Sequence, residues 1–156
     1  MTPLPADLTT LLCHQANAPE GITSVEALAD LWLADHRKDP GEDAGEPVWS
    51  DLCVFELDAH PEELLAFCLR AIRKAENGWQ VGLIAAGPLE ELLGAHGPVV
   101  IARIEDQARR APRIAYALTG LWQPEDCDPD VWARIEAART PMMDRGLDAG
   151  APLPPA

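Results

Sequence analysis

Apolar residues recur along this chain at the three- and four-residue spacing of helices that bury one face. The clearest case begins at His60-Pro61-Glu62-Glu63, where Pro61 suits the first helical position and the two glutamates suit the positive end of the helix dipole. We expect its buried stripe to consist of Leu64, Leu65, Cys68, Ala71 and Ile72. Asn77-Gly78 is expected to end this helix.

Other helix starts follow the same logic. Thr23-Ser24-Val25-Glu26 reads as a capping box, in which the Thr23 hydroxyl and the Glu26 carboxylate accept from each other's free backbone amides. Prolines begin several of the later apolar runs, as expected at a first helical position. The predicted helices cover residues 4–17, 23–36, 48–58, 61–77, 88–95, 98–110 and 112–122, with a last one starting at 128–130.

Residues 79–86 fit either a buried strand or a helix. No second strand candidate exists, and a lone strand would leave its backbone groups unpaired, so a helix is predicted. The chain is therefore expected to be all-α: a single domain of eight or nine short helices, arranged as a helical-hairpin stack or an irregular bundle. The domain is expected to span 1–139, with 38–47 as a mobile acidic loop and 140–156 as a flexible C-terminal tail.

The charge is unevenly distributed. The formal net charge is −14, and residues 1–69 hold 14 acids against two bases, whereas residues 70–156 hold 12 acids against ten. An acidic half disfavours direct contact with nucleic acid or an anionic membrane, because phosphates are bound by lysine and arginine. It favours a basic partner, although solubility is the commoner role of such charge.

These charges suggest a non-enzymatic interaction module, such as an immunity protein, antitoxin or inhibitor. Its partner would be a basic protein, for example a nucleic-acid-binding protein or a toxin, whose basic groove accepts carboxylates in place of phosphates. The candidate partner-binding residues are Asp35, Asp39, Glu42, Asp43, Glu46, Asp51, Glu56 and Asp58.

Residues suited to catalysis or metal binding are scattered. No cysteine or histidine pair has the spacing of a zinc site, and no serine or cysteine sits in a nucleophile motif, so no metal, cofactor or catalytic residue is predicted. His96-Gly97 is expected to end a helix, with Gly97 in the left-handed conformation. The alternatives are an enzyme in which His60 or His96 works beside a carboxylate, and a structural scaffold subunit.

Two further features of the sequence concern its cellular location and its aromatic residues. Residues 1–17 lack a secretory signal pattern and no apolar run reaches the length of a membrane span, so a reduced cytoplasmic location is expected. Five of the eight aromatic residues are tryptophans, for which core packing is expected; an exposed one would indicate a binding surface.

A block in the middle of the chain carries a resemblance. Residues 83–93 (LIAAGPLEELL), followed by His96-Gly97, residues 101–105 and Leu121-Trp122, resemble an uncharacterised family of small bacterial proteins with the pattern GAGPLEDLL…HG…IE…A…P…L…W. The resemblance covers about residues 48–135, and Ala85 stands where glycine is more usual. It implies a helical fold and a bacterial or phage-related cytoplasm, and it carries over no catalytic residue.

Overall fold

The computed structural model describes residues 1–12, 19, 21–37, 47–141 and 150–156. Within these ranges the regular structure is helical, apart from one isolated bridge between Pro3 and Ser24, so the predicted all-α class is confirmed. The α-helices are α1 (Ala6–Leu12), α2 (Val25–Asp35), α3 (Trp49–Glu56), α4 (Pro61–Lys74), α5 (Gly78–Ile84), α6 (Glu90–Arg110), α7 (Pro112–Ala117) and α8 (Pro129–Ala138). Short turns of other helix types are η2 (Leu57–Ala59), η3 (Ala85–Leu89) and η4 (Leu118–Gly120).

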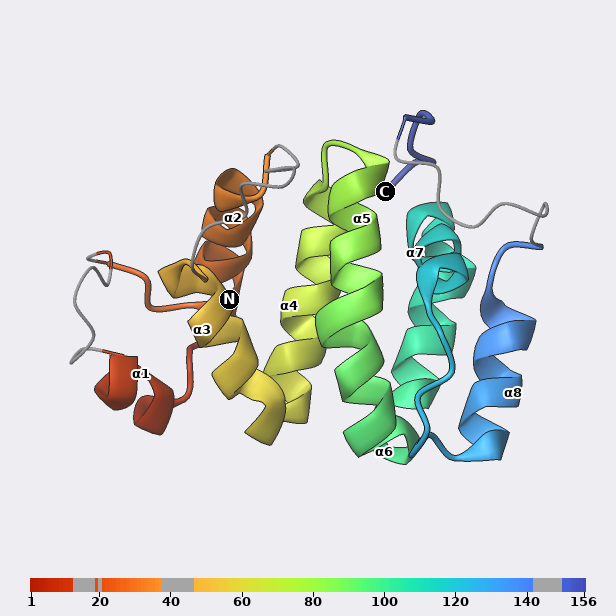
Figure 1. Ribbon diagram of the computed structural model, residues 1–156, viewed down its shortest axis with the longest axis horizontal. Coiled ribbons are helices and arrows are strands. Elements are labelled where there is room, and N and C mark those ends of the chain that lie inside the picture. Colours follow the sequence, from red (N-terminus) through yellow and green to blue (C-terminus); the bar gives the residue numbers. More distant parts are fainter. Residues whose placement is uncertain (13–18, 20, 38–46, 142–149) are drawn as a thin grey trace.

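The helices stand in a row that runs from α1 at one end, past α2 and α3, to α8 at the other (Figure 1). The amphipathic helix α4 lies in the middle and packs against α2, α5, α6 and α7. Its predicted stripe is buried, and Phe67 joins that stripe with a fully buried ring. The single amphipathic face of α4 therefore links the two ends of the row.

The start of α2 differs from the predicted capping box. Ser24, rather than Thr23, is the N-cap, and its hydroxyl oxygen accepts from the Ala27 amide at 3.1 Å. The Glu26 carboxylate instead accepts from the Thr2 amide at 2.9 and 3.0 Å. The expected pairing was wrong because the N-terminal segment supplies a tertiary donor that the local pattern does not show.

The end of α4 also differs from expectation. The helix ends at Lys74, and Asn77 caps the next helix by accepting from the Gln80 amide at 2.9 Å. Residues 78–84 are then helical, as predicted for the ambiguous segment. Asn77-Gly78 is thus a helix start, because an Asn side chain in extended backbone is as good an N-cap as it is a terminator.

The predicted helices at 88–95 and 98–110 are two arms of one kinked element. Gly87 leaves helical geometry (φ −124°, ψ −106°) within η3, and His96 does so within α6 (φ −133°, ψ 16°). Pro98 lies two residues after the kink at His96. At the start of a helical arm, the amide hydrogen that proline lacks would have no partner within the helix, so its loss weakens the helix little there. The two predicted helices are therefore parts of one element in the structure.

Gly97 does not take the left-handed cap conformation predicted for it. Among the described glycines, Gly21 has positive φ (85°) and Gly97 does not. Gly97 is buried, and a Cβ added there would lie 2.9 Å from Cγ1 of Val131. Its role is therefore to let α6 approach α8 closely.

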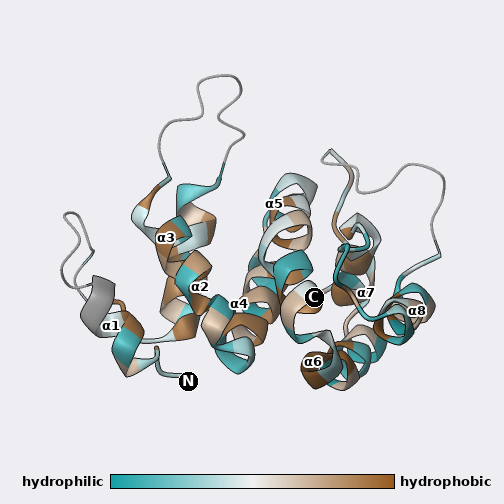
Figure 2. Cartoon of the chain, turned by 60° about the horizontal axis from the view of Figure 1, so that its bottom comes forward, coloured by the Kyte–Doolittle hydropathy of each residue, from teal (hydrophilic) through white to brown (hydrophobic). Residues whose placement is uncertain are grey.

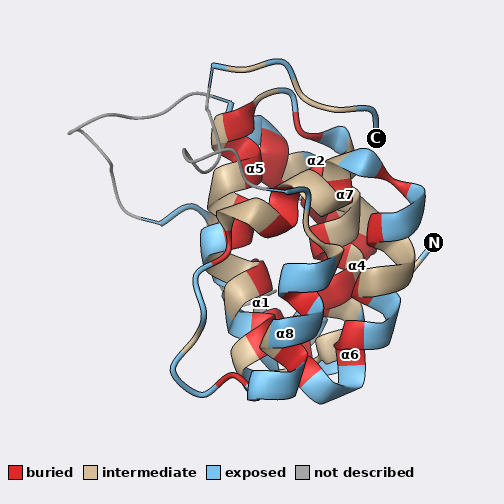
Figure 3. Ribbon diagram, turned by 90° about the vertical axis from the view of Figure 1, so that its right-hand side faces the viewer, coloured by how far each residue is buried: buried red, intermediate tan, exposed pale blue. Residues whose placement is uncertain are grey.

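The core fills the space between neighbouring helices. Apolar residues gather on the faces that the helices turn toward one another (Figure 2), and buried positions follow the same faces (Figure 3). Trp32 belongs to the buried core, and Trp49 and Trp132 pack against it while partly exposed. Trp122, however, is 77% exposed, so core packing was the wrong expectation for it.

Residues 140–156 were predicted to form a tail, and those from 142 to 149 lie outside the described residues. The last residues lie against α7: Arg113 donates through Nε to the Pro154 carbonyl at 2.8 Å, and its amide donates to the Pro155 carbonyl at 3.0 Å. Nη1 of Arg113 also donates to the Arg73 and Ala75 carbonyls at the end of α4. One guanidinium therefore joins the C-terminal segment to the central helix.

Candidate interaction surface

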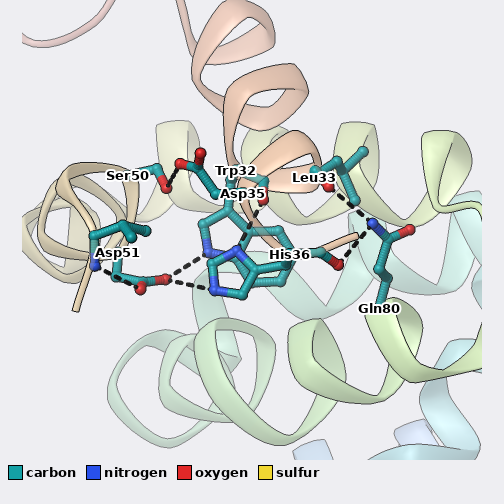
Figure 4. Close-up of polar contacts among 8 residues, drawn as sticks. Trp32, Leu33, Asp35, His36, Ser50, Asp51 and Gln80 are labelled. Carbon is teal, nitrogen blue, oxygen red and sulfur yellow. Dashed lines mark hydrogen bonds and ion pairs between the residues drawn. The ribbon is translucent and has the colours of Figure 1, made fainter. Parts of the chain in front are cut away.

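A polar cluster joins the end of α2 to α3 and α5 (Figure 4). Nε2 of His36 lies 3.1 Å from Oδ1 of Asp51, and the same oxygen accepts from Nε1 of Trp32 at 3.0 Å. Oδ2 of Asp51 accepts from the Val48 amide at 3.2 Å. Nδ1 of His36 lies 2.8 Å from the Trp32 carbonyl. We call His36, Asp51 and Trp32 the histidine cluster.

Both ring nitrogens of His36 face groups that can only accept, a carboxylate and a carbonyl, so the geometry requires both to carry hydrogen. Burial by itself lowers the pKa of His36, but the bonds to Asp51 and to the Trp32 carbonyl outweigh it and raise that pKa. Burial likewise acts to raise the pKa of Asp51, yet the bond and charge of His36 hold it below its usual value. Both ring nitrogens of His36 are therefore engaged in this geometry, and neither is left to take a proton from a substrate.

The cluster is held rigidly. The His36 ring stacks on Trp32 with centroids 4.1 Å apart and planes 21° apart, an arrangement that favours a cation over an indole face. Behind it, the buried amide of Gln80 donates to the carbonyls of Leu33 (2.9 Å) and His36 (3.0 Å), which satisfies the end of α2. The position of His36 is thus fixed from both sides.

The cluster gives stability a predictable pH dependence. A raised His36 pKa means that its contribution is complete below the ordinary value of 6.5 and is lost as the pH rises through the folded pKa. The lowered Asp51 pKa means that its contribution is complete above 3.8 and is lost as the pH falls through its folded pKa. We expect the free energy of unfolding, measured by urea titration from pH 5.5 to 9, to fall with pH more steeply for the native chain than for Asp51→Asn. Parallel curves would show that the pair makes no such contribution.

Beside the histidine cluster lies an apolar hollow of about 410 Å³. Its apolar walls are Trp32, Val54, Phe55, Trp79, Leu83 and Pro88. The polar groups that line it are His36, Asp51 and Glu91. We call this the apolar hollow.

A second hollow of about 540 Å³ adjoins it and shares Phe55 and Glu91 with it. Among the described residues, five carboxylates line this acidic hollow, together with Phe55, Gly94, Ala95 and Pro124, and no basic side chain does. The carboxylates are those of Asp58, Glu90, Glu91, Glu125 and Asp126. They come from η2, from the start of α6 and from the segment before α8, so the fold gathers them from three places.

None of these five carboxylates pairs with a cation of the described chain, a property they share with scattered acids such as Glu63 and Asp130. Elsewhere arginines neutralise acids, as in the pairs Arg70–Asp30 and Arg134–Glu105. Among the described residues no ion pair reaches a carboxylate of the acidic hollow, and its one hydrogen-bonded carboxylate, Glu90, accepts from the Trp122 amide at 3.3 Å. The acidic hollow therefore gathers several carboxylates in one concavity, and no cationic side chain of the described residues neutralises them.

The structure disperses the partner-binding residues predicted from the sequence. Asp39, Glu42, Asp43 and Glu46 lie outside the described residues. Asp35 is exposed and accepts from the Ser50 hydroxyl at 2.6 Å, while Asp51 is engaged in the histidine cluster. Glu56 is exposed, and Asp58 is the one predicted residue that lines the acidic hollow.

Sequence reasoning missed the other four carboxylates of the acidic hollow. Glu90-Glu91 fall in the first turn of a predicted helix, where the helix dipole alone accounts for acidic residues, and Glu125-Asp126 lie in the half of the chain with a nearly balanced charge. A usable signal was present: neither acidic pair has a lysine or arginine three or four residues away, whereas Glu105 and Asp106 do. Local spacing can thus mark acids that have no neighbour to neutralise them.

The other residues considered for chemistry are occupied or inert. His60 pairs with exposed Asp7 through Nε2 at 3.1 Å, and Nε2 of His96 donates to the Asp58 carbonyl at 2.8 Å. Burial raises the pKa of the Cys53 thiol to about 12, with the Glu56 charge adding to the effect, and burial also raises the pKa values of Cys68 and Cys127. None of the thiols in the described part of the chain is therefore an activated nucleophile.

Cys13 lies outside the described residues. Within the ranges that the structure covers, no group of three or more metal-ligating side chains comes together. Among the same residues, no helix combines the length and the apolar character needed to cross a membrane.

Comparison with known proteins identifies the family. No curated protein and no solved structure matches the chain. One family model matches residues 36–143, a longer span than the expected 48–135. The match includes His36 and Asp51 of the histidine cluster but not Trp32. The match covers well over half of the sequence, and the chain belongs to the family of unknown function DUF6869.

Proposed function

We propose that this protein is a non-enzymatic interaction module that binds a basic protein through the acidic hollow. The observation that carries the proposal is the gathering of five carboxylates from three segments around one concavity that no basic side chain of the described ranges lines. Unpaired charges of one sign in a concave site attract a partner of the opposite sign and speed its encounter. A basic partner would supply cationic groups to pair with these carboxylates.

An exposed aromatic ring lines the same hollow, and a second exposed aromatic residue contacts one of its carboxylates through its backbone. Phe55, in its wall, is 67% exposed, and Trp122, whose amide contacts Glu90, is 77% exposed. Large exposed aromatic side chains are enriched at interfaces, and guanidinium groups both stack on such rings and pair with carboxylates. The combination favours arginine over lysine in the partner.

This functional class, an interaction module for a basic partner, is the one predicted from the sequence, but the binding surface lies mainly on other residues. Of the acids predicted from the sequence, Asp58 lines the acidic hollow, and the other four carboxylates of this hollow come from residues 90–126. An immunity protein, antitoxin or inhibitor acting on a nucleic-acid-binding protein or a toxin in the cytoplasm is the corresponding biological setting. Fractionation of cells that express the tagged chain tests the location.

Affinity capture from the native host, followed by binding measurements on the recovered partner, tests the function. The combined variant Glu90→Gln, Glu91→Gln, Glu125→Gln and Asp126→Asn should weaken binding about thirtyfold or more, since each lost charge pair is worth about 0.5–1 kcal/mol. Binding by the native chain should also weaken as salt rises.

A matched control removes the same charge elsewhere. Glu63→Gln, Glu76→Gln, Asp130→Asn and Glu136→Gln together change the net charge equally at positions that do not line the hollow. This control should stay within a few fold of the native affinity. Equal losses for both variants would mean that net charge, rather than the acidic hollow, attracts the partner, and the proposal would fail.

A further inference from the structure

We infer that the bound partner places one apolar side chain in the apolar hollow while an arginine of the same segment occupies the acidic hollow. The inference rests on the proposed function and specifies the partner: a segment with an apolar residue of leucine size a few positions from an arginine. In this arrangement the apolar hollow, which the charge argument does not involve, contributes to binding as well.

The apolar hollow is suited to an inserted side chain. It is walled by two indole rings, Trp32 and Trp79, and by Leu83, and its volume of about 410 Å³ lies in the range of ligand-binding concavities. The Trp32 wall is held in place, because its ring stacks on His36 and packs in a T-shaped arrangement with Phe67, with ring centroids 5.9 Å apart. A preformed pocket of this kind lowers the entropic cost of binding.

The charges that line the apolar hollow determine which kind of apolar ligand it accepts. His36 and Asp51 line the hollow as an ion pair and cancel one another, so the uncompensated charge at the rim is that of Glu91. An apolar ligand with an anionic head would be repelled by Glu91 and by the acidic hollow beyond it. An apolar side chain on a basic segment meets no such repulsion.

The two hollows are close enough for one segment to reach both. Phe55 and Glu91 belong to both linings, so the concavities meet along a shared wall. An extended chain advances about 3.3 Å per residue, so side chains three positions apart lie about 10 Å from each other along a single segment. The exposed Phe55 ring would then be covered by the segment as it crosses.

Three synthetic peptides test the inference. They are acetylated and amidated Leu-Gly-Gly-Arg-Arg, Ala-Gly-Gly-Arg-Arg and Leu-Gly-Gly-Gln-Gln, titrated into the ¹⁵N-labelled full chain at low salt. The reporter is the indole N–H resonance of Trp79, assigned with Trp79→Phe. The leucine–arginine peptide should bind about tenfold more tightly than its alanine counterpart, since burying a leucine side chain is worth at least that factor. Only the leucine–arginine peptide should shift the Trp79 resonance strongly.

Variants separate this inference from the proposed function. Leu83→Trp, which fills the apolar hollow, should abolish the preference for leucine over alanine while the arginine dependence remains. Phe55→Ala, at an exposed position that a stable fold tolerates, should weaken the leucine–arginine peptide, whereas Val99→Ala, exposed but in neither lining, should not. Thermal melts of each variant establish that it is folded.

Two results would overturn the inference in distinguishable ways. Equal affinities of the leucine and alanine peptides, both still lost in the acidic-hollow variant, would overturn it and leave the proposed function standing. Failure of both arginine peptides to bind at low salt would count against the proposed function as well.

Discussion

Phe67→Ala is expected to lower the free energy of unfolding by about 3–5 kcal/mol, the cost of emptying a fully buried aromatic site. The Phe67 ring is 0% exposed and lies on the face of α4 that contacts the neighbouring helices. Its edge meets Trp32 across a centroid distance of 5.9 Å, so its removal takes support from the histidine cluster as well as from the core. A loss of this size is a large share of the roughly 5–15 kcal/mol that stabilises an ordinary domain.

The chain offers a matched control for this substitution. Phe55, the other phenylalanine, is 67% exposed, so Phe55→Ala should change the free energy of unfolding by no more than about 0.5 kcal/mol. Urea unfolding followed by tryptophan fluorescence measures both. A Phe67→Ala chain as stable as Phe55→Ala would contradict the central packing of α4 described above.

Gln80→Leu is expected to have the second largest effect, a loss of at least about 2 kcal/mol, because each buried polar group left unpaired costs about 1–3 kcal/mol. The Gln80 amide donates to the Leu33 and His36 carbonyls, and its oxygen accepts from the Glu76 amide at 2.7 Å. Leucine has a similar volume, so the loss reports hydrogen bonds rather than a cavity.

This variant should also disturb the histidine cluster. The His36 carbonyl loses its donor, so the end of α2 can relax and weaken the contact of His36 with Asp51. NMR titration should therefore give His36 a lower pKa in Gln80→Leu than in the native chain. Gln123→Leu, at an exposed position, is the control and should leave both stability and titration unchanged. An unaltered His36 titration in Gln80→Leu would show that α2 holds its end without this amide.

The helices follow from local sequence to a large extent. The stripe of α4, the proline starts of α4, α7 and α8 and the helical nature of α5 all reflect interactions within one or two turns, which a sequence pattern contains. The helix-capping predictions were wrong where a residue distant in sequence makes the contact instead. Glu26 bonds to Thr2 instead of completing a capping box, and Gly97 serves the packing of Val131 instead of a helix end.

The candidate site was much less accessible to sequence reasoning. Net charge directed attention to residues 1–69, yet four of the five carboxylates of the acidic hollow lie beyond them. The balance of charge in the second half concealed them, because the arginines counted there pair with other acids, such as Glu105 and Asp106. Which charges cancel depends on distances between helices, and a sum along the chain does not contain these distances.

The sequence by itself determined an all-α chain, its acidity and its family, because periodicity, composition and a recognisable central block are properties of the chain order. The tertiary structure alone decided which polar groups meet. It turned His36 into a charged, fully bonded partner of Asp51, and it gathered Glu90, Glu125 and Asp58 around one concavity. The physical reason is that helix formation depends on neighbours in sequence, whereas charge pairing and concavity depend on how separate helices pack.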